Sequence, residues 1–487
     1  MEQLNRRDFL KLVGIGAAGA ALYPLRGFAK NNFANRNMNI IYILADDLGY
    51  GELGCYGQKR IKTPNIDRMA KEGMMFTDHY AGSTVCAPSR CCLMTGYHTG
   101  HADIRGNSGG LSDEITSKLT AQMPIPEKTK TVAECLKEGG YKTALIGKWG
   151  LGDIGTEGHP NKQGFDYFFG YLDQRHAHNY YPEYLFRNEE KVRLEGNRID
   201  NPFPYGEGIA DKREQYSHDL FTEESLKYIE QNKKNPFFLY LALTIPHANN
   251  RGGDNGRDIG MEVPDLGIYE DKDWPFAEKG KAAMITRMDK DIGRLLTKLE
   301  NLGIAENTIV IFSSDNGPHK EGGAQPDFSN SSGPFRGIKR DLYEGGIRIP
   351  MIAWSPGNIK PNSKSDHVSA FWDFLPTACE IGGVSIPQNI DGISFLPELL
   401  GKKQKEHEYL YWEFFDKSKI KQAVRIRNYK FVRPAYDDDW ELYDLETDIG
   451  EKNNIVNQYP GLMNELKKIL KNVRSESEYW KMPYEVK

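Results

Sequence analysis

The segment Cys86-Ala87-Pro88-Ser89-Arg90-Cys91-Cys92-Leu93-Met94-Thr95-Gly96 places a thiol at the expected start of a helix. Pro88 has a fixed φ and no N–H, which suits a first helical turn. Cys86 and Arg90 are four residues apart, so on a helix they share a face. The helix dipole and the guanidinium both favour an anion there, which makes Cys86 a candidate nucleophile. For an isolated Cys-x-x-x-Arg, a buried cysteine beside an incidental surface arginine is the simpler interpretation.

Short apolar runs alternate with amphipathic helices on both sides of this segment. That pattern is typical of an α/β fold with a mostly parallel central sheet flanked by helices. Runs that are apolar throughout suit strands covered on both faces, and we expect such strands at residues 39–44, 141–146, 236–243, 308–313 and 349–354. We expect helices at residues 131–138, 219–231 and 282–301.

The sequence changes character near residue 400. Beyond it, residues 408–415, 423–434 and 440–445 indicate antiparallel strands, and residues 459–473 an amphipathic helix. We therefore predict two domains after the N-terminal segment. They are a catalytic α/β domain over residues 31–400 and a smaller C-terminal α+β domain, built on an antiparallel sheet, over residues 401–487.

The N-terminus indicates export. Asn5-Arg6-Arg7-Asp8-Phe9-Leu10-Lys11 precedes a short apolar segment rich in Gly and Ala, the pattern of a twin-arginine signal. We assign residues 1–30 to this signal and expect an exported, periplasmic protein. Retention of the segment as a membrane anchor is the alternative. No apolar run in the rest of the chain reaches the ~20 residues of a membrane span.

Composition narrows the class of protein further. A net charge of −5 and a pI near 6.2 argue against broad nucleic-acid binding, which needs a basic face. Six cysteines in 487 residues are too sparse for a disulfide framework and lack zinc-site spacing, although one or two disulfides stay open.

Two pairs of polar residues follow predicted strands. Asp46 and Asp47 come just after the first strand, and Asp315 and Asn316 follow another. Open α/β sheets bind ligands at the carboxyl ends of their strands, and carboxylates gathered there need a cation. Hard oxygen donors suit Ca²⁺ or Mg²⁺. Taken singly, an Asp-Asp pair is more often a solvated turn or a helix cap.

The 86–96 segment, with C-A-P-S-R followed by L-x-T-G, resembles the signature of type I sulfatases, the formylglycine-dependent, arylsulfatase-like members of the alkaline-phosphatase-like superfamily. The resemblance implies that fold and the hydrolysis of a sulfate ester. It also implies that a formylglycine-generating maturation enzyme oxidises Cys86. A divalent cation, Ca²⁺ rather than Mg²⁺, would be bound by the modified Cys86 together with Asp46, Asp47, Asp315 and Asn316.

Three more motifs extend the resemblance: Gly147-Lys148-Trp149-Gly150, Ile245-Pro246-His247, and the string at residues 337–350 that contains Lys339. The resemblance implies that Arg90, Lys148 and Lys339 contact the sulfate. It implies that His247 is the general acid for the leaving alcohol. Taken singly, a lysine is more often a solvated surface charge.

One position departs from the family pattern, which is usually G-K-W-H-x-G. Here Gly150 replaces a histidine that normally hydrogen-bonds the formylglycine hydrate. His176 or His178 is a candidate substitute, and each could equally be a surface or substrate-contact residue. We also predict substrate contacts for Arg105 and His319.

For the substrate, the aromatic residues 167–184 suit stacking on a sugar ring. With the Gly150 variant, this stretch resembles a sulfatase branch that acts on sulfated galactose-type sugars. We predict a sulfated saccharide, with 4-sulfated galactose or N-acetylgalactosamine as the specific choice. The alternatives are a phosphomonoester or phosphonate-ester hydrolase of the same superfamily and a non-catalytic, glycan-binding pseudo-sulfatase.

Overall fold

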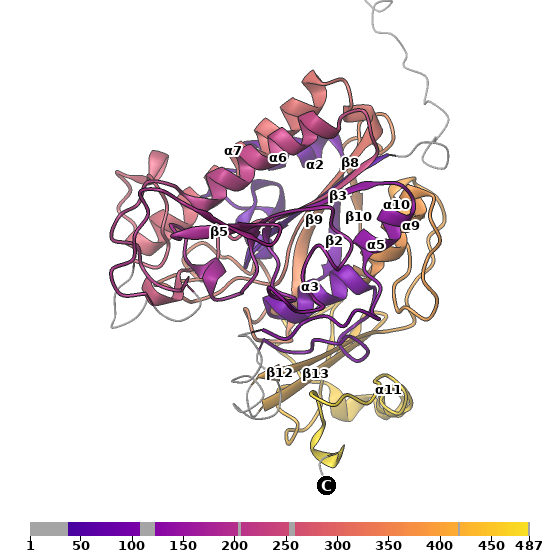
Figure 1. Cartoon of the computed structure of the whole chain (residues 1–487). Coiled ribbons are helices and arrows are strands. Elements are labelled where there is room, and N and C mark those ends of the chain that lie inside the picture. The colour runs from indigo at the N-terminus through magenta and orange to yellow at the C-terminus, as the bar shows by residue number, and fades with distance from the viewer. Residues whose placement is uncertain (1–37, 108–121, 203–205, 253–258, 417–418, 486–487) are drawn as a thin grey trace, which may run out of the picture.

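The computed structural model describes residues 38–107, 122–202, 206–252, 259–416 and 419–485 (Figure 1). These residues form a mixed 11-stranded sheet and a separate four-stranded antiparallel sheet. No helix in the described part of the chain is both long and apolar enough to cross a membrane. The predicted export segment, residues 1–30, lies outside the described residues.

Four parallel strands lie side by side at the centre of the large sheet. In spatial order they are β8 (Thr308–Ser314), β1 (Asn39–Ala45), β7 (Phe237–Ala242) and β3 (Lys142–Lys148). Nearly every residue of these strands is buried, as expected of apolar runs covered on both faces. The predicted runs are confirmed, with ends shifted by one or two residues.

Helices cover both faces of this sheet because its side chains alternate between them (Figure 1). Ile41 and Ile43 pack on one side with α2 (Pro64–Glu72), α6 (Ser217–Asn232) and α7 (Phe276–Asn301). Ile40 and Tyr42 pack on the other side, where the helices are α3 (Cys86–Thr95), α5 (Val132–Glu138) and α9 (Phe374–Gly382). The central sheet is therefore the middle layer of three.

The outer strands make the sheet mixed. The predicted strand at residues 349–354 is β9 (Arg348–Trp354), which runs antiparallel to both of its neighbours, β8 and β2 (Met74–Tyr80). Further strands at the two edges were not predicted: β4 (Tyr167–Tyr171), β5 (Tyr184–Arg187), β6 (Glu190–Arg193), β10 (Ser363–Ser365) and β11 (Ser369–Ala370).

The second sheet is an antiparallel meander of β12 (Leu410–Asp416), β13 (Lys419–Ile426), β14 (Tyr429–Arg433) and β15 (Glu441–Asp444). It is followed by α11 (Pro460–Ile469). The single strand predicted at residues 423–434 is wrong, because a turn divides that run between β13 and β14. Arg427 occupies the turn with a φ of +54°. Two short helices, α8 (Glu344–Ile347) and α10 (Leu396–Leu399), precede the meander in the chain.

The two sheets share buried contacts. The Trp412 indole on β12 donates a hydrogen bond to the Ala81 carbonyl at 2.9 Å and packs on Tyr80 and Trp372.

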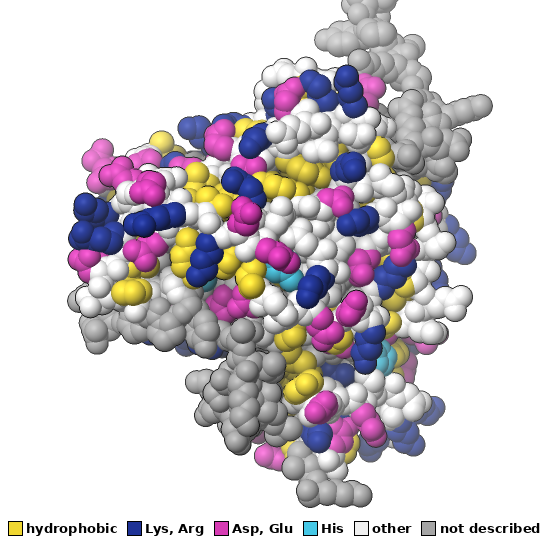
Figure 2. All heavy atoms as spheres, viewed as in Figure 1, with side chains coloured by type: hydrophobic (Ala, Val, Ile, Leu, Met, Phe, Trp, Pro, Cys, Tyr) yellow, Lys and Arg dark blue, Asp and Glu magenta, His cyan; other side chains and the backbone are white. Residues whose placement is uncertain are grey.

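None of the six cysteines forms a disulfide, and all six lie in the described residues. On the face shown in Figure 2, the acidic and basic side chains of the described residues are interspersed, without a broad basic patch among them.

A buried charge cluster joins β14 of the second sheet to α8, which directly precedes β9 of the large sheet. Lys430 is fully buried, and its Nζ lies 2.8 Å from Glu344 Oε1 and 3.2 Å from Glu451 Oε1. Removing one member of such a cluster leaves the other charges buried without a partner.

We therefore expect Lys430→Met to lower the free energy of unfolding by about 3–5 kcal/mol. Chemical denaturation followed by fluorescence measures this loss. The matched control is Lys298→Met, because Lys298 pairs with Glu230 at the surface; there the change stays within about 1 kcal/mol. Equal effects of the two variants would contradict the interpretation.

Candidate active site

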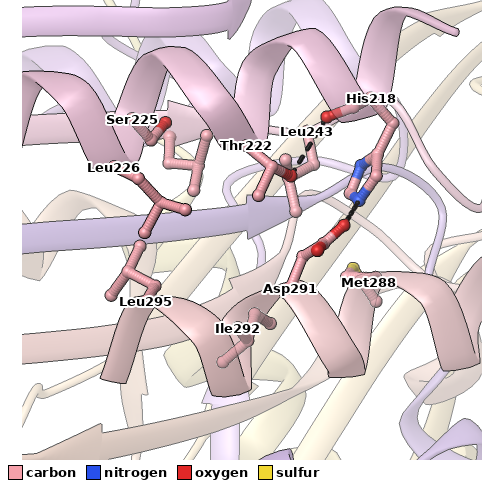
Figure 3. A pocket seen from close by; sticks show the side chains of 10 residues that line it. His218, Thr222, Ser225, Leu226, Leu243, Met288, Asp291, Ile292 and Leu295 are labelled. Atoms are coloured by element: carbon pink, nitrogen blue, oxygen red, sulfur yellow. Dashed lines mark hydrogen bonds and ion pairs between the residues drawn. The ribbon is translucent and has the colours of Figure 1, made fainter. Parts of the chain in front are cut away.

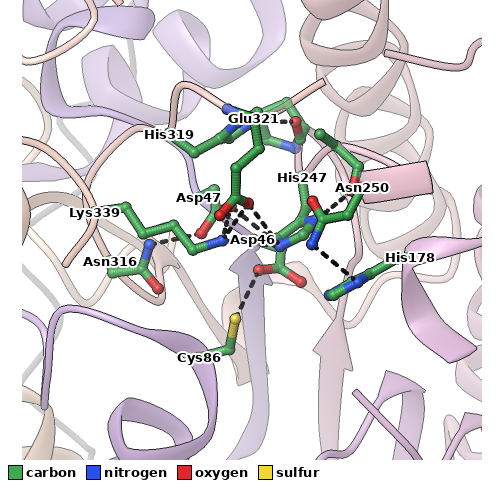
Figure 4. Close-up of polar contacts among 12 residues, drawn as sticks. Asp46, Asp47, Cys86, His178, His247, Asn250, Asn316, His319, Glu321 and Lys339 are labelled. Carbon is green, nitrogen blue, oxygen red and sulfur yellow. Dashed lines mark hydrogen bonds and ion pairs between the residues drawn. The ribbon is translucent and has the colours of Figure 1, made fainter. Parts of the chain in front are cut away.

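The two predicted polar pairs meet because their strands are paired in register. Ala45 of β1 lies opposite Ser314 of β8, so the next residues of both strands leave the sheet together. The Asp47 amide donates to Asp315 Oδ1 at 3.0 Å, and Asn316 Nδ2 donates to Asp47 Oδ1 at 2.7 Å. Figure 4 shows Asp46, Asp47 and Asn316 in one cluster.

Cys86 is the first residue of α3 and lies against this cluster. Its Sγ is 3.5 Å from Asp46 Oδ1 (Figure 4). Burial, followed by the Asp46 charge, raises the pKa of the Cys86 thiol well above its usual range. In these surroundings the thiolate form of unmodified Cys86 is therefore disfavoured.

Three buried cations surround the carboxylates. Lys148, the last residue of β3, places its Nζ 2.6 Å from Asp46 Oδ2. Arg90 Nη2 lies 2.9 Å from Asp315 Oδ2 and 3.4 Å from Asp46 Oδ2. Lys339, from the loop after β8, places its Nζ 2.7 Å from Asp47 Oδ2. The sequence motifs had predicted these residues for the same site, and the structure brings them together.

His247 follows β7 at the same edge of the sheet. Its Nδ1 lies 2.6 Å from the Ala248 carbonyl, so Nδ1 carries the proton and donates. Its Nε2 faces the cluster, 2.9 Å from Lys339 Nζ and 3.3 Å from Asp47 Oδ2. Burial, and then the Lys339 charge, lowers the pKa of His247 well below its usual range. The imidazole therefore presents an unprotonated Nε2 to the site.

The residues fit a hard divalent cation. Three carboxylates and one amide, all buried, supply oxygen donors within one cluster. Asn316 Oδ1 is buried without a hydrogen-bond partner among the described residues, as expected of an oxygen meant for a metal. Burial, and then the charge of Asp46, raises the pKa of Asp315 to about 7, so an added positive charge would be favourable there.

The two candidate histidines of the loop after β4 lie apart. The His178 ring stacks on His247 with centroids 4.3 Å apart, and its Nδ1 is 3.4 Å from Asn250 Nδ2 (Figure 4). His176 instead packs between Tyr171 and Tyr184, with centroids 4.9 and 4.5 Å away. Of the two, the structure brings His178 into the site and packs His176 between aromatic rings.

The prediction of a substrate contact is wrong for Arg105. Its guanidinium is buried, with Nη1 donating to Glu413 Oε1 at 2.8 Å and Nη2 to Ser475 Oγ at 3.0 Å. His319 lies beside the cluster, yet backbone groups occupy both ring nitrogens. Its Nε2 lies 3.1 Å from the Pro246 carbonyl, and its Nδ1 accepts from the Glu321 amide at 3.0 Å. His319 therefore holds loops in place rather than facing a substrate.

The aromatic stretch 167–184 does not form the predicted stacking surface. Residues 167–171 are strand β4, and Tyr171, Tyr180 and Tyr181 are buried in the core. Their burial explains the aromatic composition of this stretch without a bound sugar.

Two residues of this region were not predicted. Glu321 Oε2 lies 2.9 Å from Lys339 Nζ, and its only sequence signal is its place six residues after Asp315. Gln174 fills the space beside Gly150, because a Cβ on Gly150 would lie 2.0 Å from Gln174 Nε2. Neither polar atom of the Gln174 amide has a hydrogen-bond partner among the described residues. No local sequence pattern links Gly150 to Gln174.

A second cavity, away from this site, is too small to be a substrate site. It lies between α6 and α7, where His218 Nε2 is 3.1 Å from Asp291 Oδ2 (Figure 3). Leu226, Met288 and Leu295 are among its lining residues, and its volume is about 10 Å³. That room holds at most a single water molecule.

A protein-family model matches the part of the chain that contains the cluster at the sheet edge. The Sulfatase family model matches residues 38–384, which include every residue of the cluster. The chain belongs to the sulfatase family. A second family model, N-sulphoglucosamine sulphohydrolase, C-terminal, matches residues 336–476.

Alignments with individual relatives cover most of this chain. It is 32% identical to N-acetylgalactosamine-6-sulfatase of Canis lupus familiaris, over 92% of this chain and 78% of the relative. It is 31% identical to N-acetylgalactosamine-6-O-sulfatase of Bacteroides thetaiotaomicron, over 92% of this chain and 95% of the relative. The crystal structure of Ps i-CgsB in complex with k-i-k-neocarrahexaose superposes on this structure with a TM-score of 0.75 at 25% identity. The superposition covers 92% of this chain and 96% of that chain. The sulfatase has the alkaline-phosphatase-like fold and is a sulfuric ester hydrolase.

The packing of Gln174 against Gly150 predicts an interaction between substitutions at these positions. Gly150 has a φ of +84°, so Gly150→His costs about 1–3 kcal/mol of backbone strain and must also displace Gln174. Gln174→Gly removes the need to displace Gln174. The double variant should therefore lose less free energy of unfolding than the sum of the losses in the two single variants. Urea denaturation of the four proteins tests this cycle, and strictly additive changes would contradict it.

Proposed function

We propose that this sulfatase removes sulfate from a sulfated saccharide by means of a formylglycine made from Cys86 and a bound Ca²⁺. One observation carries the proposal: Cys86 begins α3 beside Asp46, inside a buried cluster of carboxylates and fixed cations. If Cys86 were converted, the hydrated aldehyde would supply a hydroxyl nucleophile at this position.

The cation would be held by the four oxygen-donor residues Asp46, Asp47, Asp315 and Asn316. It would supply positive charge next to the nucleophile. Lys148 and Lys339 now bind oxygens of Asp46 and Asp47. A cation bound to those carboxylates would release both ammonium groups for an anion.

The protein's own charges then stabilise the transferring group. Arg90, Lys148 and Lys339 are buried and fixed by neighbouring groups, so they need little reorganisation as charge develops on the sulfate oxygens. His247 Nε2 is unprotonated in the structure described, so as general acid it would have to gain a proton, which the negative charge of a bound sulfate ester would favour. The hydrogen bond from Nδ1 to the Ala248 carbonyl fixes the ring with Nε2 facing the site.

His178 and Gln174 are the groups that we propose in place of the histidine missing at position 150. His178 is stacked on His247, and Gln174 occupies the space beside Gly150. Because neither amide atom of Gln174 has a partner among the described residues, the side chain is available to a ligand.

For the substrate we propose a galactose-type sugar sulfate. The sequence predicts 4-sulfated galactose or N-acetylgalactosamine, whereas the two relatives are named as sulfatases of the 6-position of N-acetylgalactosamine. We therefore propose 6-sulfated N-acetylgalactosamine as the first compound to test and the 4-sulfated sugar as the second. The twin-arginine segment supports export to the periplasm.

Sulfate release from defined sugars tests the function. We expect the wild type to release sulfate from 6- or 4-sulfated N-acetylgalactosamine and far less phosphate from the matched phosphate ester, with ion chromatography as the readout. Mass spectrometry of the peptide containing residue 86 should show CHO in place of CH₂SH. Cys86→Ala should abolish release, whereas the control Cys55→Ala should retain it.

Two outcomes would favour the alternatives. Faster release of phosphate than of sulfate would identify a phosphate-ester hydrolase. Saccharide binding that Cys86→Ala leaves unchanged, with no sulfate released by the wild type, would identify a pseudo-sulfatase.

Metal binding has a readout that is independent of turnover. After dialysis against a chelator, we expect CaCl₂ to raise the Tm more than MgCl₂ does, because a ligand of the native state stabilises it by mass action. Asp47→Asn should reduce the shift, and Asp103→Asn, outside the cluster, should leave it unchanged. A shift that is the same in Asp47→Asn and in the wild type would remove Asp47 from the metal site.

A further inference from the structure

Glu321 is a carboxylate of the site that the proposed reaction does not use. It comes from the loop after β8 and lies on the opposite side of the cluster from Cys86 (Figure 4). Its Oε2 is 2.9 Å from Lys339 Nζ, and its Oε1 is 3.2 Å from Arg340 Nη2. Glu321 thus lies between a buried cation and one that is partly exposed.

The Lys339 ammonium has three hydrogen-bond donors and three partners. They are Asp47 Oδ2 at 2.7 Å, Glu321 Oε2 at 2.9 Å and His247 Nε2 at 2.9 Å. Asp47 is one of the proposed cation ligands. When Asp47 binds a cation, Glu321 is the charged partner of Lys339 that remains.

The backbone around Lys339 is also held in place. Arg340 has a φ of +78°, a conformation that a non-glycine residue keeps only where the surroundings enforce it. Its amide donates to the Thr84 carbonyl at 3.1 Å, and Lys421 Nζ donates to its carbonyl at 2.8 Å. Glu321 binds the Arg340 side chain, so it fixes two consecutive residues, Lys339 and Arg340.

The backbone of Glu321 is itself held by a hydrogen bond to His319. Its amide donates to His319 Nδ1 at 3.0 Å, and His319 Nε2 lies 3.1 Å from the Pro246 carbonyl. Pro246 directly precedes His247. This chain of bonds joins the loop after β8 to the segment after β7, so Glu321 is set against both Lys339 and His247.

We propose that Glu321 is a positioning residue that keeps the Lys339 ammonium directed at the sulfate group. The inference rests on the proposed function, in which Lys339 contacts sulfate. A carboxylate close to an anion site repels the anion, so its charge alone would weaken sulfate binding. The two roles of Glu321, positioning and repulsion, therefore predict opposite effects when the charge is removed.

The test is Glu321→Gln, which keeps the size of the side chain and removes its charge. We expect kcat on the sulfated sugar to fall about tenfold, the size of effect expected when one preorganised contact is loosened. We expect the inhibition constant of inorganic sulfate to rise about threefold, although a negative charge has been lost. Glu321→Asp, which retains the charge, should recover part of both losses.

Double substitution separates positioning from a general loss of structure. Lys339→Ala/Glu321→Gln should be no slower than Lys339→Ala, because Glu321 acts through Lys339. The matched control is Glu230→Gln, a glutamate paired with Lys233 and Lys298 away from the site, and it should change neither constant. Circular dichroism and Tm show that each variant is folded.

The results distinguish this inference from the proposed function. Unchanged kcat with tighter sulfate binding in Glu321→Gln would overturn the positioning role while sulfate release by the wild type stood. If the wild type released no sulfate, the proposed function would fail. Calorimetric titration of inorganic sulfate into wild type and Glu321→Gln would then still decide whether Glu321 supports an anion site at Lys339.

Discussion

The in-register pairing of two parallel strands is the constraint on which the site depends. Because Ala45 lies opposite Ser314, Asp46, Asp47, Asp315 and Asn316 have to leave the sheet at one point. Buried carboxylates that close together repel one another unless positive charge lies among them. Arg90, Lys148 and Lys339 supply that charge from a helix, a strand end and a loop. A one-residue shift of register would reverse the faces of β1 and disperse the cluster.

Much of this arrangement could be predicted from the sequence because it depends on local signals. An apolar run followed by Asp46 or Asp315 marks a strand end, and Pro88 marks the first turn of α3. Parallel strands then bring their carboxyl ends to one edge. The roles of Cys86, Lys148, His247 and Lys339 depended on longer motifs, since a single lysine or histidine carries no such signal.

The wrong or missing predictions about the site concern contacts between distant segments. Arg105 follows a polar loop, but its partner Glu413 is 308 positions away on the second sheet. The packing of Gln174 against Gly150 depends on the path of the chain after β4, which no local pattern specifies. The aromatic residues after β4 are apolar because they are buried, and their composition alone does not separate a core strand from a sugar platform.

The second sheet contributes no residue to the cluster described above, yet it binds segments that carry residues of that cluster. Arg105, which follows α3, is bound to Glu413, and Glu344, five residues after Lys339, is bound to Lys430. The segments next to α3 and Lys339 are thus both bound to residues of the second sheet. The C-terminal region is therefore not a detachable module, because without it the buried charges of Arg105 and Glu344 would lose their partners Glu413 and Lys430.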